Sequence, residues 1–465
     1  MQTTYFLCIT LIVCCITFVL SDVNSIRNAE PSLCYDNVDS PYILFSTKTG
    51  YRVNQNKDDE EVKVKGCVAK QLWLMSRHGT RNTGTKDMIK MKEKLPLIFK
   101  DIKLNHKEGR GSLCEDDINN LEDWEFIANV TEDKFLVREG FLELKGLGRR
   151  FQKRFPTLLS KPYVNESYEF QFTDSERTDV SAQAFAKGMF GKKDSSNVYM
   201  KKSPKPDNLL RFYRTCDKWL KEVDENPDAT IEKKLFEKTP EFLSMIKSVS
   251  DRLGFTSLRT LGDIDLMYSM CSFDKAWRPK DLSAWCAVFN ENDLQILEYR
   301  EDLEYFYEDG YGYSINYEQA CTPLKHIIEN FGQTVQESEV SRPKGFFYFT
   351  HSGTILKVLA RMGLFEDAVR PTHLNRLDIH KRAWRTSLID SFASNIAFAL
   401  FKCSDDYRVT AYFQERPVRL PGCSHELCHF REFVNQYGSL AEKYSLTICY
   451  VSHNPICAKC MQSQP

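Results

Sequence analysis

An apolar run that stops at a cluster of cations constrains this chain more than any other feature. Leu72-Trp73-Leu74-Met75 is followed, after one residue, by Arg77-His78-Gly79-Thr80-Arg81. A buried strand that ends in this way puts an imidazole and two guanidinium groups at the edge of a sheet, where open α/β sheets hold their ligands. The guanidinium fork matches the oxygens of phosphate. We therefore expect His78 to be a nucleophile that becomes phosphorylated, with Arg77 and Arg81 binding the phosphate.

Two further strands are expected to end in polar residues. The stretch 168–172 alternates aromatic with polar residues and precedes Arg177, while the apolar run 346–349 precedes His351. Helical patterns cover 87–103 and 180–190, and segments 396–401 and 409–413 are further strand candidates. We predict an α/β fold with a doubly wound, parallel or mixed sheet and helices on both faces. In such a sheet Arg177 and His351 would join His78 at one rim.

The chain is expected to divide around a helical insertion. Residues 204–335 have mostly helical patterns, whereas strand and helix patterns alternate before and after them. We predict an α/β domain whose first part, 26–203, carries the nucleophile motif. A mainly α-helical domain at 204–335 interrupts it. The second part, 336–465, contributes His351.

The first 25 residues are expected to form a secretory signal peptide, because an apolar run extends to Leu20 and is followed by plausible cleavage sites. No Lys or Arg precedes this run, so a signal anchor is the alternative. No later segment approaches the ~18 uninterrupted apolar residues of a membrane helix. The tail has neither a retrieval signal nor an anchor sequence. We predict a secreted protein or one of the secretory-pathway lumen, with no stable membrane insertion after signal cleavage.

Cysteine usage and glycosylation motifs agree with that compartment. Three of the 16 cysteines lie within the first 25 residues, which leaves thirteen in the mature chain. Such a number behind a signal peptide indicates disulfides, and an odd number leaves at least one thiol free or paired between chains. Asn129 and Asn165 each begin an N-x-S/T sequon for glycosylation.

Charge and metal-ligand patterns exclude several other classes of function. Lys and Arg number 63 and Asp and Glu 64, so no overall field attracts nucleic acid, and we expect a small polyphosphate as the partner. His425-Glu426-Leu427-Cys428-His429 matches the H-E-x-x-H pattern of zinc proteases, which requires a helix. Pro421-Gly422 precedes it, and Cys423 and Cys428 indicate a local disulfide or loop instead. We expect neither a metal nor a cofactor.

The predicted cluster suits phosphoryl transfer, which needs positioning of the phosphoryl group and neutralisation of charge on its oxygens. An imidazole nitrogen in the right tautomer can attack phosphorus, and water can then hydrolyse the covalent intermediate. Each residue alone has a plainer interpretation: a solvated strand end for His78, an ion-pair partner for Arg177, a helix-start histidine for His351. Their combination favours a phosphate site.

The motif at 77–81 with a later strand-end histidine resembles the histidine acid phosphatases, branch two of the histidine phosphatase superfamily. Within them the chain resembles the multiple inositol polyphosphate phosphatases, whose further segments occur here in the order that family shows. These segments are Met270-Cys271-Ser272-Phe273-Asp274-Lys275-Ala276, Trp285-Cys286, Leu297-Glu298-Tyr299-Arg300-Glu301-Asp302-Leu303, Gly310-Tyr311-Gly312-Tyr313, Ala393-Ser394-Asn395, Leu420-Pro421-Gly422-Cys423 and Cys428.

The resemblance implies an α/β domain and an α domain with the phosphate site in the cleft between them. It implies that His78 forms the phosphohistidine. It also implies a set of residues that bind the scissile phosphate: Arg77, Arg81, Arg177 and His351. The implied substrates are inositol hexakisphosphate and lower inositol polyphosphates, with 2,3-bisphosphoglycerate as a further candidate.

The chain departs from that family at the residue that protonates the leaving oxygen. The family reads His-Ala-Glu, and its broader relatives His-Asp, where this chain reads His351-Ser352-Gly353, so the aligned position, Gly353, has no acid. General acid catalysis is typically worth about a hundred- to ten-thousandfold. A second departure is Asn82-Thr83-Gly84 where relatives usually carry Tyr-Pro-Thr.

Three hypotheses follow from the missing acid. The first is an active phosphatase that takes its proton from another carboxylate, from water or from a neighbouring substrate phosphate. The second is a catalytically impaired relative that binds inositol polyphosphates. The third is a signal-anchored glycoprotein with a vestigial site. Retention of His78 favours the first, because anion binding alone needs no nucleophile.

Overall fold

A mixed sheet forms one half of the molecule in this computed structural model, which describes residues 34–35, 42–336, 342–404, 406–442 and 446–449. The eight-stranded sheet has the order β3-β2-β4-β1-β5-β6-β7, and β8 also pairs with β6. The β3, β2, β4 and β1 strands run parallel, whereas β5 to β8 pair antiparallel. The strands are β1 (Cys67–Arg77), β2 (Tyr168–Phe172), β3 (Met200–Lys202), β4 (Gly345–Thr350), β5 (Asn395–Cys403), β6 (Asp406–Phe413), β7 (Arg416–Val418) and β8 (Leu427–His429).

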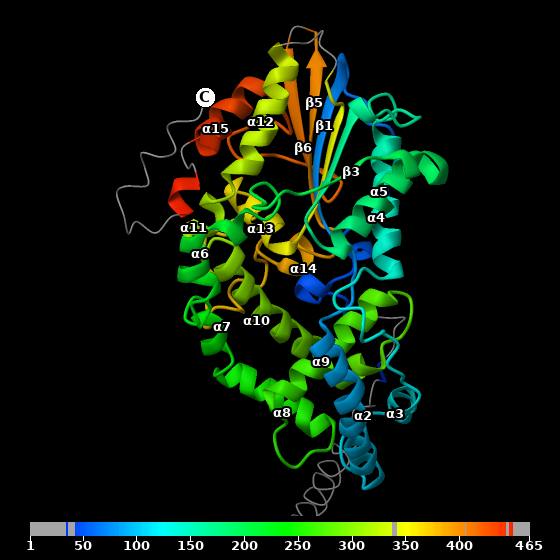
Figure 1. The fold of residues 1–465 in the computed structure, drawn as a ribbon. Coiled ribbons are helices and arrows are strands. Elements are labelled where there is room, and N and C mark those ends of the chain that lie inside the picture. Colours follow the sequence, from blue (N-terminus) through cyan, green and yellow to red (C-terminus); the bar gives the residue numbers. More distant parts are fainter. Residues whose placement is uncertain (1–33, 36–41, 337–341, 405, 443–445, 450–465) are drawn as a thin grey trace, which may run out of the picture.

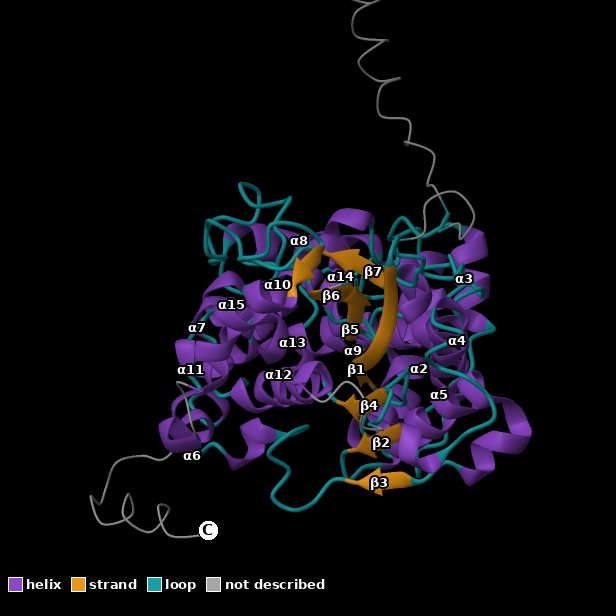
Figure 2. Ribbon diagram, turned by 90° about the horizontal axis from the view of Figure 1, so that it is seen from above, coloured by secondary structure: helices purple, strands orange, loops and turns teal. Residues whose placement is uncertain are grey.

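Helices cover both faces of the sheet, as predicted (Figure 2). Leu72 and Leu74 of β1 face the core under α4 (Arg138–Arg154) and α5 (Glu176–Asp194). Trp73 and Met75 face the opposite core, under α12 (Cys321–Gln336), α13 (Ser352–Arg361) and α15 (Phe430–Glu442). The run is apolar throughout because alternate side chains of a strand point to opposite faces and both faces are buried.

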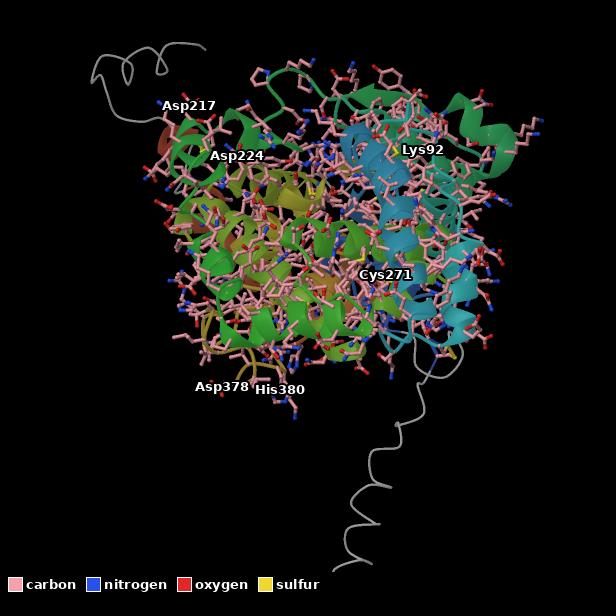
Figure 3. All side chains as sticks on the ribbon, turned by 90° about the horizontal axis from the view of Figure 1, so that it is seen from below. Lys92, Asp217, Asp224, Cys271, Asp378 and His380 are labelled. Atoms are coloured by element: carbon pink, nitrogen blue, oxygen red, sulfur yellow. A yellow bond between two sulfur atoms is a disulfide. The ribbon has the colours of Figure 1, made fainter. Side chains whose placement is uncertain are left out.

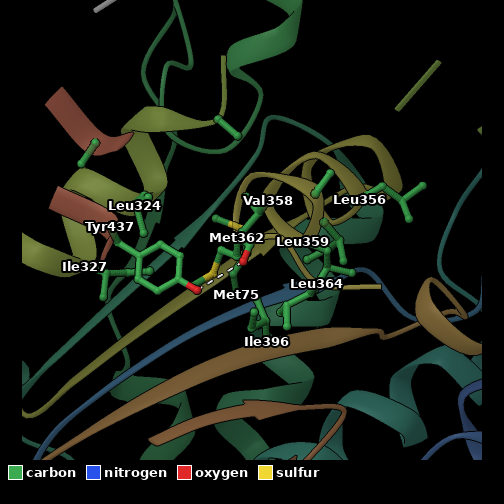
Figure 4. Packing of buried hydrophobic residues seen from close by; sticks show 14 of the residues in the cluster. Met75, Leu324, Ile327, Leu356, Val358, Leu359, Met362, Leu364, Ile396 and Tyr437 are labelled. Carbon is green, nitrogen blue, oxygen red and sulfur yellow. Dashed lines mark hydrogen bonds between the residues drawn. The ribbon is translucent and has the colours of Figure 1, made fainter. Parts of the chain in front are cut away.

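Figure 4 shows the packing of that second core. Met75 of β1 and Ile396 of β5 lie against Leu359, Met362 and neighbouring residues of α13. The hydroxyl of Tyr437, from α15, donates a hydrogen bond to the carbonyl of Met362 at 3.2 Å. These contacts hold α13, which begins just after His351, and α15 against the same face of the sheet.

A helical part lies at the end of the molecule toward which the parallel strands run (Figure 1). Its core is formed mainly by five helices: α2 (Thr85–Lys107), α3 (Glu115–Glu122), α8 (Pro240–Arg252), α9 (Leu261–Trp277) and α10 (Glu291–Asp309). Four shorter helices are α6 (Asp217–Trp219), α7 (Ile231–Phe236), α11 (Ser314–Glu318) and α14 (Thr386–Ile389). Of these, α7 packs in the core of the helical part, whereas α6, α11 and α14 contribute to the core on the α12 and α13 side of the sheet. The division at 204–335 stays a prediction; α12, inside that range, packs on the sheet.

Five disulfides tie distant segments together within the described residues. They join Cys34 to Cys114, Cys67 to Cys403, Cys216 to Cys449, Cys271 to Cys286 and Cys423 to Cys428. Seen from below, Cys271 lies among the helices, while Asp217, Asp378 and His380 lie at the edge of the molecule (Figure 3).

Two predictions about peripheral segments have different outcomes. The local disulfide at Cys423 and Cys428 is confirmed, and the H-E-x-x-H match runs into strand β8 rather than lying in a helix. The signal peptide at 1–25 lies outside the described residues. Among the helices that the structure does describe, none is both long and apolar enough to cross a membrane.

Candidate active site

The three predicted strand ends converge. Arg77, the last residue of β1, pairs with Thr350, the last residue of β4. On the other side of β4, Phe172 of β2 pairs with Phe349. Because these strands are parallel neighbours, His78, His351 and Thr173 follow three adjacent ends at one edge of the sheet, as the sequence predicts.

The loop after β1 is fixed against α4 and α5. A Cβ added at Gly79 would lie 2.5 Å from the carbonyl oxygen of Gly140, so only two glycines permit this approach of loop and helix. The carboxylate of Glu143, one turn further along α4, accepts hydrogen bonds from the Thr80 amide at 2.7 Å and its hydroxyl at 3.0 Å. The Gly79 amide donates to the Ser181 hydroxyl of α5 at 3.2 Å. Two helices thus hold the backbone that carries His78.

The His78 imidazole is held in one tautomer by its own loop. Its Nδ1 lies 2.9 Å from the carbonyl oxygen of Gly79, an acceptor only, so Nδ1 carries the hydrogen and Nε2 keeps its lone pair. Burial, together with the positive charges of Arg77, Arg177 and Arg81, lowers the pKa of His78 well below its usual value. The imidazole is therefore neutral under mildly acidic conditions, with Nε2 available to attack.

Three arginines lie near His78, and a fourth that the sequence did not predict, Arg211, lies near His351 and Arg177. Arg77 Nη1 donates to the backbone carbonyls of Thr47 and Asp390 at 2.8 and 2.5 Å. Arg81, Arg177 and Arg211 lie close enough to both histidines or to one another to shift their pKa values. Burial and the neighbouring guanidinium groups lower the pKa of Arg81 to about 9. The cluster holds positive charge that an anion would neutralise.

Each of these four guanidinium groups has a buried Nε without a hydrogen-bond partner among the described residues: Arg77, Arg81, Arg177 and Arg211. Unpaired buried donors are rare in folded proteins, and several on neighbouring arginines indicate a ligand with several acceptor oxygens. A tetrahedral phosphate has that number of oxygens. Arg211 escaped the sequence prediction because it precedes a short 3-10 helix, Phe212–Thr215, and carries no strand-end signal.

His351 lies beside His78, with ring centroids 5.6 Å apart. Its Nε2 is 2.8 Å from the Thr173 hydroxyl, and Arg177 Nη2 is 3.3 Å from its Nδ1. Arg177 can only donate, so Nδ1 is the acceptor and Nε2 carries the hydrogen. Burial and the adjacent arginines lower its pKa well below the usual value. With its hydrogen on Nε2, His351 orients Arg177 through Nδ1. For His351 to bind phosphate itself, the contact between Arg177 Nη2 and His351 Nδ1 has to break.

No metal site was expected from the sequence, whereas two glycosylation sites were predicted. Within the described residues one group could hold a metal by proximity, Cys34, Cys114 and Asp117, but its two cysteines are joined in a disulfide and are not available as ligands. Asn129 and Asn165 are both exposed, so their side chains are accessible for modification. Glycosylation at them stays a prediction.

Comparison with known proteins gives consistent matches. Residues 69–416 match the model of the histidine phosphatase superfamily (branch 2). Multiple inositol polyphosphate phosphatase 1 of Drosophila melanogaster is 30% identical over 410 residues, covering 86% of this chain and 85% of the relative.

Two solved structures share the fold. The multiple inositol polyphosphate phosphatase of Bifidobacterium longum in complex with inositol hexasulfate superimposes with a TM-score of 0.64, at 14% identity, covering 87% of this chain and 98% of that one. The phytase from D. castellii superimposes with a TM-score of 0.69, at 15% identity, covering 90% and 91%.

Proposed function

Because the chain belongs to branch 2 of the histidine phosphatase superfamily and is a phosphoric monoester hydrolase of the histidine acid phosphatase type, we propose that it hydrolyses inositol polyphosphates through a phosphohistidine at His78. One observation carries the proposal: the His78 imidazole, with a free Nε2, lies in a cluster with His351 and four arginines whose Nε donors have no partner among the described residues.

The assigned roles follow from charge and position. Nε2 of His78 attacks phosphorus, the bond from phosphorus to the inositol oxygen breaks, and the leaving oxygen takes up a proton. Water then attacks the phosphohistidine and releases inorganic phosphate. Arg77, Arg81, Arg177 and Arg211 neutralise the charge on the phosphoryl oxygens during both steps. His351 positions Arg177 and contributes to the phosphate site.

The substrate class is supported by relatives. The Drosophila relative is a multiple inositol polyphosphate phosphatase by name, and the Bifidobacterium structure was obtained with inositol hexasulfate, which carries several tetrahedral anions on one ring. A cluster of four arginines suits substrates with more than one such group. Inositol hexakisphosphate is the first substrate to test.

The compartment is part of the proposal. Five disulfides, two exposed sequons and the apolar N-terminal run all fit secretion or a secretory-pathway lumen. Disulfides of this number persist in an oxidising compartment and are rare in the cytosol.

Rapid-quench labelling tests the proposal. The parent protein, mixed with ³²P-labelled inositol hexakisphosphate, is expected to acquire acid-labile label and release inorganic phosphate, and His78→Ala is expected to do neither. His106→Ala is the matched control, because His106 is a partly exposed histidine of α2 paired with Glu115. It should label like the parent.

The impaired relative is the second candidate, and Gly353 is the observation that favours it. Tight binding of inositol hexakisphosphate by the parent, with no label and no phosphate release, would exclude the hydrolase and support a binding protein. Label that persists in His78→Ala would exclude His78 as the nucleophile.

A further inference from the structure

The position that lacks an acid is already filled by a carboxylate from another helix. A Cβ added at Gly353, in the first turn of α13, would lie 3.0 Å from Oδ1 of Asp309, the last residue of α10. Asp309 forms an ion pair with the fully buried Lys357, one turn along α13. An acidic side chain at 353 would therefore meet a second negative charge, and Asp309 itself is held in its ion pair with Lys357.

A second carboxyl group lies on the other side of this turn. The Ser352 hydroxyl donates a hydrogen bond to Oδ2 of Asp390. The same Oδ2 lies 3.5 Å from Arg77 Nη1, whereas Oδ1 is buried without a hydrogen-bond partner among the described residues. Asp390 is 0% exposed. It therefore lies beside a phosphate-binding arginine but has no direct access to solvent.

Ser352 connects this buried carboxyl to the site. From Thr354 to Arg361 every residue of α13 is buried, whereas Ser352 and Gly353 at its start are only partly buried. Ser352 also follows His351 directly in sequence. Ser352 thus lies at the partly open start of the helix, next to His351 at the strand edge where the phosphate is expected, and its hydroxyl contacts Asp390.

We propose that Asp390 and Ser352 form a proton relay that replaces the missing acid at Gly353; this rests on the proposed phosphohistidine mechanism. As Nε2 of His78 bonds to phosphorus and the ester P–O bond breaks, the Ser352 hydroxyl gives its proton to the leaving oxygen. With the acid protonated, the Ser352–Asp390 hydrogen bond runs in the opposite direction: Oδ2–H of Asp390 donates to Ser352 Oγ and passes its proton there as the hydroxyl hydrogen leaves. In the second step the attacking water returns a proton to Asp390 by the same path, and the relay is restored.

Complete burial of Asp390 favours the protonated acid that the relay needs, against the pull of the nearby cations. Complete burial and the negative charge of Asp309 raise its pKa, while Arg77, the Ser352 hydrogen bond and Lys48 lower it, and the balance is about 7. A bound phosphate neutralises Arg77, which removes the strongest opposing charge and raises the proton affinity further. Asp390 is thus protonated in the substrate complex at acidic pH.

The relay predicts a selective defect that depends on the leaving group. 4-Nitrophenyl phosphate expels a stable phenolate and needs no proton, whereas glycerol 2-phosphate expels an alkoxide that does. Asp390→Asn and Ser352→Ala are expected to slow phosphoenzyme formation from glycerol 2-phosphate by about a hundredfold or more. With 4-nitrophenyl phosphate the loss should stay within a few-fold.

Single-turnover rapid quench with the full-length protein measures both rates. Ser391→Ala is the matched control, because Ser391 adjoins Asp390, is equally buried, and its hydroxyl has no hydrogen-bond partner among the described residues. The control should retain the parental rates with both esters. Equal losses with both esters in the two relay variants, or no loss with either, would overturn the relay.

The pH profile separates a proton donor from a structural group. The parental rate with glycerol 2-phosphate should fall as pH rises above about 7, where Asp390 loses its proton, and Asp390→Asn should lack this alkaline limb. A retained limb in Asp390→Asn argues against the relay. If the parent protein forms no phosphoenzyme with either ester, the proposed phosphohistidine mechanism is excluded, and the relay with it. If only the relay is wrong, the parent protein is still labelled at His78.

Discussion

At the residue scale, the site is dominated by cations without matching anions. Arg81, Arg177 and Arg211 have no carboxylate within ion-pair distance among the described residues, and Arg77 has one, at 3.5 Å in Asp390. Elsewhere in the fold buried arginines are paired, as Arg150 and Arg154 are with Glu415. Because burying unpaired charge is unfavourable, the cluster does not serve the stability of the empty protein, and the proposed phosphate ligand would explain it.

Arg211 provides a test of this explanation. Arg211→Ala is expected to lower kcat/KM for inositol hexakisphosphate by roughly ten- to a hundredfold, because a hydrogen bond to a charged group contributes about 1.5–3 kcal/mol. Steady-state phosphate release measures the change. Arg214→Ala is the matched control, since Arg214 is an exposed residue of the same segment paired with Asp224. Equal losses in both variants would indicate damage to the segment rather than loss of a phosphate contact.

The sequence predicted the residues that lie in the motif or at strand ends, because the pattern that marks them is in the neighbouring sequence. An apolar run that predicts a strand precedes Arg77, His78 and Arg81, and a second such run precedes His351. Arg211 and Asp390 lie in segments without periodicity, and only the tertiary fold brings them to the site. Asp309 is the last residue of a long helix, so its place beside Gly353 depends on how two helices pack.

At the element scale, the contact between α4 and the loop after β1 controls the nucleophile. A Cβ at Gly140 would lie 2.6 Å from the Thr80 amide nitrogen, where no real contact can remain, so Gly140→Ala should displace the loop that carries His78. We expect a loss of labelling by at least tenfold and a lower melting temperature. Labelling and thermal unfolding measure the two effects.

Gly332→Ala in α12 is the control for that substitution. No atom lies within 4 Å of a Cβ added there, so alanine should raise stability by about 1 kcal/mol through its helix propensity and leave labelling unchanged. A Gly140→Ala protein that labels at the parental rate would show that the close approach of α4 does not position His78.

Element prediction succeeded where hydrophobic patterns are long. The segments predicted as strands fall within β1, β2, β4, β5 and β6, and the helices predicted at 87–103 and 180–190 fall within α2 and α5. The short strands β3, β7 and β8 were missed because three residues carry no period. The sheet order was not predicted either, since pairing of β1 with β5 and β4 depends on contacts distant in sequence.

At the scale of the whole molecule, the disulfides differ in how much of the chain they enclose. Cys67–Cys403 spans 336 residues and joins the outer ends of β1 and β5, whereas Cys423–Cys428 spans 5. Chain-entropy arguments assign a long loop upwards of about 4 kcal/mol and a loop of this short length about 2 kcal/mol. Replacing both cysteines of the long bridge by serine should therefore lower the melting temperature more than replacing both of the short one. A larger effect of the short bridge would contradict the entropic explanation.

The order of strands in the sheet has a consequence for biosynthesis. β4 lies between β2 and β1, although it follows both by more than a hundred and fifty residues; Thr173 and His351, in contact at the site, are 178 residues apart. When the motif at 77–81 and β2 have been synthesised, the strand that lies between β1 and β2 in the sheet has not. Until Gly345–Thr350 is made, the facing edges of β1 and β2 have no native partner and are open to wrong ones, so we expect the site to assemble late in folding.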